Sequence, residues 1–165
     1  MKGDITMTNI NSNIVIEDAS IGFRNFSGEE SKFNPKGRRN FCVFLDSETG
    51  ITLENDGWNI KWLDPRDEED EPTPFLPVAV SYDNIPPQII LITGQGKTLL
   101  DADTVSVLDW AELKMVDVII RPYNWEVNGK SGVKAYIKSM YVTIVEDELA
   151  HKYYEVPDVT DGSED

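Results

Sequence analysis

The stretch RPYNWEVNGKSGVKAYIKSMYVTI, residues 121–144, decides the fold of this chain. Polar and apolar side chains alternate on both sides of Asn128-Gly129. Asn-Gly between two such runs is typical of a tight hairpin turn, because both residues tolerate a positive φ. We therefore expect Met115–Val127 and Val133–Val145 to form an antiparallel hairpin.

The turn also predicts the register of this hairpin. A two-residue turn pairs Val127 with Lys130, and side chains then alternate between the two faces of the ribbon. In that register one face carries three cations and three aromatic rings, namely Arg121, Tyr123, Trp125, Lys134, Tyr136 and Lys138.

The opposite face of the hairpin is apolar. It would present Ile120, Val133 and Ile137, which can pack on a core. Towards the open end, however, Met140 and Val142 fall on the cationic face. Either that end is buried, or a β-bulge switches the faces there.

The rest of the chain also favours strands, because β-formers alternate between Gly and Pro turns. We expect strands at Asn13–Phe26, Arg39–Leu45, Trp58–Leu63, Phe75–Tyr82 and Gln88–Thr93, a helix begun by Asp46 or Ser47 and ended by Gly57, a second helix over Val105–Leu113 capped by Thr104, and a short helix at Glu146–Tyr154. This order predicts a mainly β fold, an OB-fold-like barrel with one or two short helices. A β-sandwich is the structural alternative.

The domain organisation follows from composition. We expect a flexible N-terminus over residues 1–12, one domain over 13–154, and a disordered acidic tail over 155–165, where residues are small and polar. No apolar run approaches the roughly 20 residues of a membrane span. One cysteine, Cys42, and one histidine, His151, exclude an internal disulfide and a conventional zinc site. We expect a cytoplasmic protein that uses no cofactor or metal and contacts no membrane.

The net charge of −15 argues against a nucleic-acid partner until its distribution is considered. Residues 64–71 carry −5 and residues 146–165 carry −7. These two segments account for most of the negative charge, and the remainder is nearly neutral. The basic residues elsewhere are therefore free to form a local positive surface.

Cations and aromatic rings are also interleaved near the N-terminus, over residues 23–41. Rings stack on bases and cations contact phosphates, so both basic segments predict a surface for single-stranded DNA. The expected nucleic-acid-binding residues are Arg24, Lys36, Arg38, Arg39, Arg121, Tyr123, Trp125, Lys130, Lys134, Tyr136 and Lys138. The alternative is an ordinary half-exposed sheet face beside a solvated basic loop.

The chain resembles bacteriophage single-stranded DNA-binding proteins with an OB fold and an acidic C-terminal tail. The resemblance lies in residues 121–144, in LDWAEL (Leu108–Leu113), in DGWNIKWL (Asp56–Leu63) and in GFRNFSG (Gly22–Gly28). It implies sequence-tolerant binding that protects single strands in DNA replication or recombination, without enzymatic activity, in the cytoplasm of the host cell. It also implies that the tail contacts replication or recombination proteins.

The acidic tail has two functional interpretations. Its charged residues, Asp158, Asp161, Glu164 and Asp165, could dock on a partner protein or compete with DNA for the basic surface. An acidic end is otherwise a solvating segment. Self-association into a homo-oligomer is also open at this point.

Two other function classes compete with strand binding. Asp101, Asp103 and Asp109 could hold the divalent metal of a phage nuclease, although Asp is also the usual turn and cap residue. A β-rich virion or protein-interaction domain is the third class. The run Gly94–Thr98 shares the end of a phosphate-binding loop, but Leu91 stands where the first glycine belongs, so we expect a turn or hairpin there.

Overall fold

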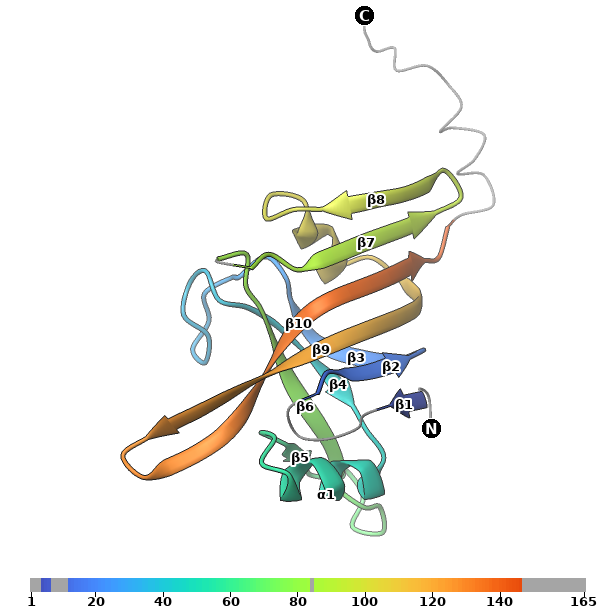
Figure 1. Ribbon diagram of the computed structural model, residues 1–165. Helices are drawn as coiled ribbons and strands as arrows, with labels where there is room; N and C mark the ends of the chain where they lie inside the picture. The colour runs from blue at the N-terminus through green and yellow to red at the C-terminus, as the bar shows by residue number, and fades with distance from the viewer. Residues whose placement is uncertain (1–3, 7–11, 84, 147–165) are drawn as a thin grey trace, which may run out of the picture.

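A computed structural model of the chain describes residues 4–6, 12–83 and 85–146. That part is mainly β, as predicted, and its elements are shown in Figure 1. The elements are β1 (Asp4–Thr6), β2 (Ile14–Glu17), β3 (Ser20–Asn25), β4 (Arg39–Phe44), α1 (Ser47–Asn55), β5 (Lys61–Leu63), β6 (Thr73–Val80), β7 (Gln88–Thr93), β8 (Gly96–Leu100), the 3-10 helix η1 (Val105–Asp109), β9 (Leu113–Val127) and β10 (Lys130–Ile144).

The long hairpin of β9 and β10 forms in the predicted register. Val127 pairs with Lys130, and Tyr123 pairs with Lys134. Asn128 and Gly129 have φ values of 52° and 79°, the left-handed conformation that a tight hairpin turn requires. The distal half of the hairpin extends well beyond the rest of the molecule (Figure 1).

A bulge at Lys138 switches the faces of β10. Ile137 pairs with Ile120, but Ser139 already pairs with Ile119, so Lys138 is the extra residue. Before the bulge Val133, Ala135 and Ile137 are buried, and after it Met140 is fully buried. The bulge is therefore what lets one strand carry an exposed cationic face near its start and a core face near its end.

The sheet closes into a barrel through its first long strand. This strand was predicted as one element, but it bends at Asp18, where φ is 51°, and so forms β2 and β3. β2 pairs with β9, whereas β3 pairs with β4, and the order between them is β9-β10-β6-β4. Along this path β6 and β10 are parallel and the other pairs are antiparallel, which is the strand order of an OB-type barrel.

The interior of the barrel is apolar. Phe26 and Phe41 are fully buried and stack with their ring centroids 5.1 Å apart. Ile14, Leu76 and Ile120 are likewise fully buried, each from a different strand. The alternation of buried and exposed positions along β6 and β10 follows the pleat, so one face of each strand lines this core.

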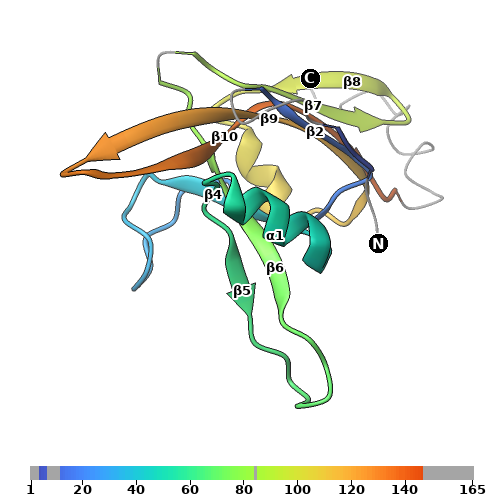
Figure 2. The same cartoon turned by 60° about the horizontal axis from the view of Figure 1, so that its bottom comes forward.

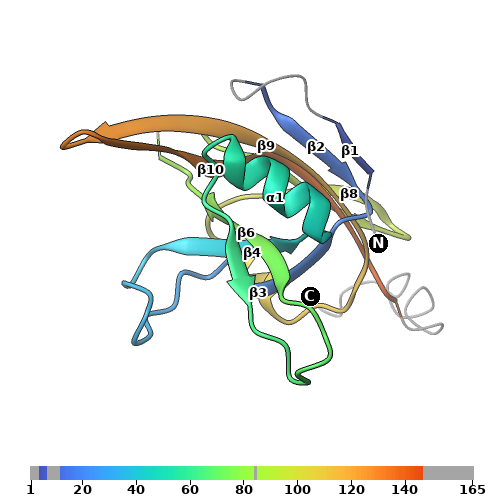
Figure 3. The same ribbon diagram turned by 90° about the horizontal axis from the view of Figure 1, so that it is seen from below.

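The first helix forms where it was predicted. Asp46 is its N-cap, and its carboxylate accepts a 2.7 Å hydrogen bond from the Thr49 N–H. Gly57, with φ at 100°, follows the helix end. The helix packs near β6 and covers one end of the barrel (Figure 3).

The second predicted helix is wrong in kind and length. The segment forms only η1, and β9 begins at Leu113, inside the expected helix. Thr104 makes no side-chain cap bond to this helix. Instead, Asp101 accepts hydrogen bonds from the backbone N–H groups of Asp103 and Thr104. A turn stabilised by an aspartate thus replaces the helix.

Two hairpins lie outside the barrel path. β7 and β8 pair around Gly94-Gln95, which confirms a hairpin rather than a phosphate-binding loop. β5 is shorter than expected and pairs with β6, and the acidic residues 64–71 form the loop that joins them. Figure 2 shows this loop projecting away from the barrel.

Other expectations concern the ends of the chain. β1 pairs with β2, within a segment that we expected to be flexible. The predicted helix after Glu146 and the acidic tail lie outside the described residues. Within the described ranges, no helix is both long and apolar enough to cross a membrane.

Replacing Asp46 by alanine should lower the free energy of unfolding by about 1 kcal/mol at neutral pH. The hydrogen bonds from Thr49 hold the pKa of the Asp46 carboxyl below its usual value. The stabilisation should therefore be present above the ordinary carboxyl pKa and disappear as the pH falls through the lowered one. Urea unfolding at neutral and acidic pH measures this.

Asp46→Asn is the matched control, because asparagine caps a helix without titrating. It should unfold with nearly wild-type stability at neutral pH. An Asp46→Ala protein as stable as the wild type at neutral pH would contradict the capping role.

Candidate nucleic-acid interface

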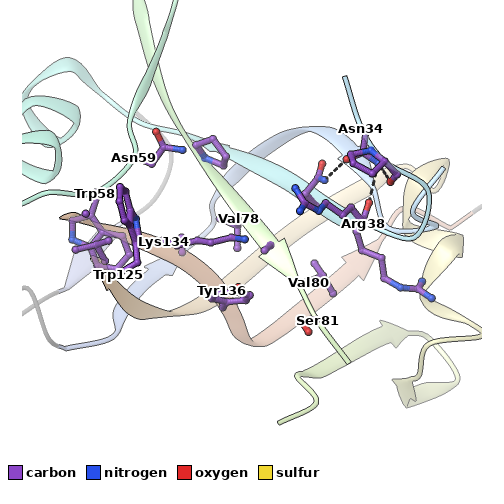
Figure 4. A pocket seen from close by; sticks show the side chains of 18 of the residues that line it. Asn34, Arg38, Trp58, Asn59, Val78, Val80, Ser81, Trp125, Lys134 and Tyr136 are labelled. Atoms are coloured by element: carbon purple, nitrogen blue, oxygen red, sulfur yellow. Dashed lines mark hydrogen bonds between the residues drawn. The ribbon is translucent and has the colours of Figure 1, made fainter. Parts of the chain in front are cut away.

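A groove of about 1220 Å³ lies between the loop 27–38 and the β9–β10 hairpin. Both walls lie on the same side of the barrel in Figures 1, 2 and 3. Figure 4 shows the groove from close by, with Lys134 and Tyr136 on the hairpin side and Arg38 on the loop side. Its aromatic and cationic lining comprises Phe33, Arg38, Arg39, Trp58, Lys61, Tyr82, Trp125, Lys134 and Tyr136.

On the hairpin wall, Tyr136 and Lys134 line the groove, and Arg121 and Tyr123 contact Tyr136 from outside the lining. The Arg121 guanidinium lies 4.9 Å from the centroid of the Tyr136 ring, and the Lys134 ammonium lies 5.0 Å from it. Tyr123 meets the same ring edge-on at 6.0 Å. The predicted face is therefore assembled, and its members hold one another in place through cation–π contacts.

Trp125 lies across the backbone of its hairpin partner, Gly132. A β-carbon at Gly132 would sit 2.8 Å from Cζ2 of the indole, closer than side chains pack. Glycine is thus required for the ring to lie flat on the strand. Trp125 remains 38% exposed, which leaves part of the ring available to a ligand.

The hairpin is anchored to the barrel next to this ring. The backbone N–H of Val133 donates a 2.9 Å hydrogen bond to the Gly57 carbonyl, and Trp58 forms a β-bridge with Val133. Trp58 is only 2% exposed and lines the end of the groove near Trp125. This link fixes the position of the exposed hairpin face relative to the groove floor.

The loop wall is organised by the side chain of Asn34. Its amide nitrogen donates to the carbonyls of Glu29, Pro35 and Arg38 at 2.8, 3.2 and 3.0 Å. Its amide oxygen accepts a 2.9 Å hydrogen bond from Asn40 on β4. One asparagine therefore fastens the loop to the barrel, so the wall has a defined shape without being a strand.

Phe33 is one of four aromatic or cationic groove residues that the sequence prediction did not select, and the others are Trp58, Lys61 and Tyr82. Phe33 is 89% exposed at the tip of the loop, with the Lys32 ammonium 5.6 Å from its ring centroid. The sequence signal was the interleaving of rings and cations over residues 23–41, which did not distinguish core from surface rings. Phe26 and Phe41 lie in the core, whereas Phe33 lines the groove.

Arg39 is fixed at the groove floor. Its guanidinium donates a 2.7 Å hydrogen bond to the Phe26 carbonyl and lies 5.5 Å from the Tyr82 ring centroid. Burial raises the pKa of Tyr82 to about 12, although the positive charge of Arg39 opposes this shift. Tyr82 therefore stays a neutral phenol at physiological pH.

Several predicted residues lie away from the groove lining. The Arg24 guanidinium donates to the carbonyls of Leu108 and Ala111, which ties β3 to the end of η1. Lys36, Lys130 and Tyr123 are exposed but do not line the groove, and neither does Arg121. Lys138 occupies the bulge.

The charge of the groove differs from that of the whole chain. Four cations line it, namely Arg38, Arg39, Lys61 and Lys134, against one acid, Asp83. The acidic loop 64–71 follows β5 and so lies beyond Lys61, outside the lining. An acidic protein thus carries a locally positive groove, as the charge distribution predicted.

Two of the three aspartates proposed as nuclease ligands, Asp101 and Asp109, have structural roles. Asp101 caps the turn before η1, and the Asp109 carboxylate accepts hydrogen bonds from the backbone N–H groups of Phe26 and Ser27. Within residues 4–6, 12–83 and 85–146, no group of three or more potential ligands is placed to hold a metal ion. Turn formation accounts for the Asp101 carboxylate, and a link between η1 and the segment after β3 accounts for that of Asp109.

An OB-type barrel with a basic, aromatic groove between the loop after its first strand and its last hairpin defines a class of nucleic-acid-binding modules. Residues 5–164 match the family described as "Putative phage ssDNA-binding domain". The chain belongs to this family of phage single-stranded-DNA-binding domains. No curated protein sequence matches the chain.

Solved structures with a similar fold come from the same class. A C-terminal truncation of the single-stranded DNA-binding protein from bacteriophage Enc34 is 11% identical with a TM-score of 0.53, covering 89% of this chain and 97% of that one. The same protein in complex with ssDNA is 11% identical with a TM-score of 0.52, covering 88% of this chain and 97% of that one. At this identity the likeness supports the barrel fold.

Proposed function

We propose that the protein binds single-stranded DNA in the groove between the loop 27–38 and the β9–β10 hairpin. The observation that carries this proposal is the meeting of rings and cations from both walls, Phe33 and Arg38 on one side and Trp125, Lys134 and Tyr136 on the other. Bases stack on rings and phosphates meet cations, which together form a site for an unpaired strand.

The chemistry of the groove favours sequence-tolerant binding. Every base has a face that can stack, so Trp125 and Tyr136 accept any of them. Cations such as Lys134 contact phosphates, which are the same at every position. A protein of this kind covers and protects single strands during phage DNA replication or recombination, without an enzymatic step, in the cytoplasm of the host cell.

The acidic tail is proposed to regulate this groove. Asp158, Asp161, Glu164 and Asp165 would compete with phosphates for the groove cations while no DNA is bound. Once DNA displaces it, the tail becomes available to a replication or recombination protein. This assignment rests on the charge complementarity between the segment and the groove.

Trp125→Ala and Tyr136→Ala should each weaken oligo-dT binding by about 1–3 kcal/mol, because each removes a stacking ring. Fluorescence anisotropy with a labelled oligonucleotide measures the affinity, and circular dichroism checks the fold. Trp110→Ala is the matched control, since Trp110 is 71% exposed and does not line the groove. Equal losses of affinity in all three variants would show that the groove rings have no special role in binding.

Binding should weaken steeply as salt rises, because each neutralised phosphate releases counterions. Lys134→Gln should reduce the slope of log affinity against log salt by about 0.7, the contribution of roughly one phosphate contact on a single strand. Lys114→Gln, an exposed lysine outside the lining, should leave the slope unchanged. A Lys134→Gln slope equal to wild type would place Lys134 away from the phosphates.

Deleting residues 158–165 should strengthen oligo-dT binding at low salt, because this segment holds four acids and no cation. Added salt should shrink the gain, since it screens the tail and the DNA alike. Anisotropy titrations of the full and shortened chains at two salt concentrations test this. If affinity is unchanged at low salt, the tail does not compete for the groove.

A further inference from the structure

A second aromatic cluster lies on the outer surface of the barrel, separate from the groove. Phe23, Phe44 and Phe75 come from β3, β4 and β6, and their ring centroids are 5.5 to 6.1 Å apart. Phe23 is 57% exposed, and the other two rings are half-buried. Phe23 belongs to the interleaved segment 23–41, and the proposed function does not use it.

The backbone at Phe23 is strained in a way that exposes its ring. Its φ is 48°, in the left-handed region that aromatic residues rarely adopt, and the β3–β4 register shifts between Gly22 and Asn25. Gly22 leaves room for the Phe44 ring, which would lie 2.6 Å from a β-carbon there. Strain of this kind is held by its surroundings and clusters at functional positions.

Strand register places this cluster on the same face as the groove. Along β6, Phe75, Pro77 and Ala79 point outward while the residues between them are buried. Pro77 and Ala79 line the groove, and Ala79 pairs with Tyr136 on β10. Phe75 is four residues from Ala79, about 13 Å along the strand. A strip of small side chains therefore joins the two aromatic clusters.

We propose that Phe23, Phe44 and Phe75 form a second stacking site for the same DNA strand, so that the strand continues from the groove across the outer face of β6 and β4. This inference rests on the proposed function. Lys61 supports DNA as the occupant, because it lines the groove and pairs with Phe75, which places a cation beside both sites.

The acidic loop 64–71 sets where this path ends. Leu63 pairs with Thr73, two positions beyond the Lys61–Phe75 pair, and the loop begins at the next residue. Its net charge of −5 would repel a phosphate backbone that passed the cluster. The loop, which has no part in the groove, gains a role as the boundary of the bound strand.

The test compares a short oligo-dT of about six nucleotides with a long one of about twenty, a range that brackets the site sizes of OB folds. Phe23→Asn removes the ring and suits the left-handed backbone, so the variant should stay folded. It should bind the short oligonucleotide like wild type and the long one about fivefold more weakly or worse, the loss expected for one stacked base. Phe23→Tyr, which keeps a ring, should bind both like wild type.

The outcomes separate this inference from the proposed function. If Phe23→Asn binds both lengths like wild type while Trp125→Ala weakens both, the second site is overturned and the groove remains the binding site. The phenylalanines would then be a packing or protein-contact surface. An equal loss at both lengths would also overturn it. Failure of the wild-type protein to bind either length would overturn the proposed function itself.

A second measurement follows the path directly. Photo-crosslinking with a long oligonucleotide carrying 5-iododeoxyuridine, read by mass spectrometry, should label the peptides that hold Phe23 or Phe75 as well as Trp125. Crosslinks confined to the groove residues would overturn the extended path. Replacing the four central acids, Asp67, Glu68, Glu69 and Asp70, with their amides should strengthen binding of the long oligonucleotide alone.

Discussion

The structure depends on one pairing, the register of β9 against β10. The left-handed turn at Asn128-Gly129 starts this register, and the bulge at Lys138 shifts it by one residue. A slip of one residue elsewhere would turn Tyr136 into the core and a buried residue such as Ala135 into solvent. The bulge at Lys138 lets Met140 complete the barrel interior. It therefore divides β10 into a half that exposes a cationic face and a half that packs in the core.

The sequence predicted this hairpin because its information is local. Turn chemistry and alternation act over a few residues, and both were visible in residues 121–144. The choice between Phe26, Phe33 and Phe41 was not visible, because it depends on how the β3–β4 connection folds. Asn34, an unremarkable loop residue by composition, determines that connection through its four hydrogen bonds. The folded arrangement of this loop, and not the alternation along the sequence, determines which ring is exposed.

Arg24 illustrates the same limit for charge. An arginine between two phenylalanines looks identical in sequence whether it faces phosphates or backbone carbonyls. Here the Asp109 carboxylate accepts a hydrogen bond from the backbone N–H of Phe26, 83 residues away in the sequence. Arg24 donates to the carbonyl of Leu108 in the same region. The second predicted helix illustrates the same limit. The helix η1 is too short to pair all of its backbone carbonyls internally, and the Arg24 guanidinium donates a hydrogen bond to the carbonyl of Leu108.

The groove also shows how an acidic protein can hold an acidic ligand. Its rings and cations are held in position before any ligand arrives, Trp125 against Gly132 and Arg39 against the Phe26 carbonyl. Side chains that are already ordered lose little further conformational freedom on binding, so more of the free energy of each stacking contact contributes to affinity. Long-range attraction, by contrast, is weakened by the charge of the whole chain and screened over about 8 Å at physiological salt. In the proposed function, affinity therefore comes from short-range contact with fixed rings and cations rather than from long-range attraction.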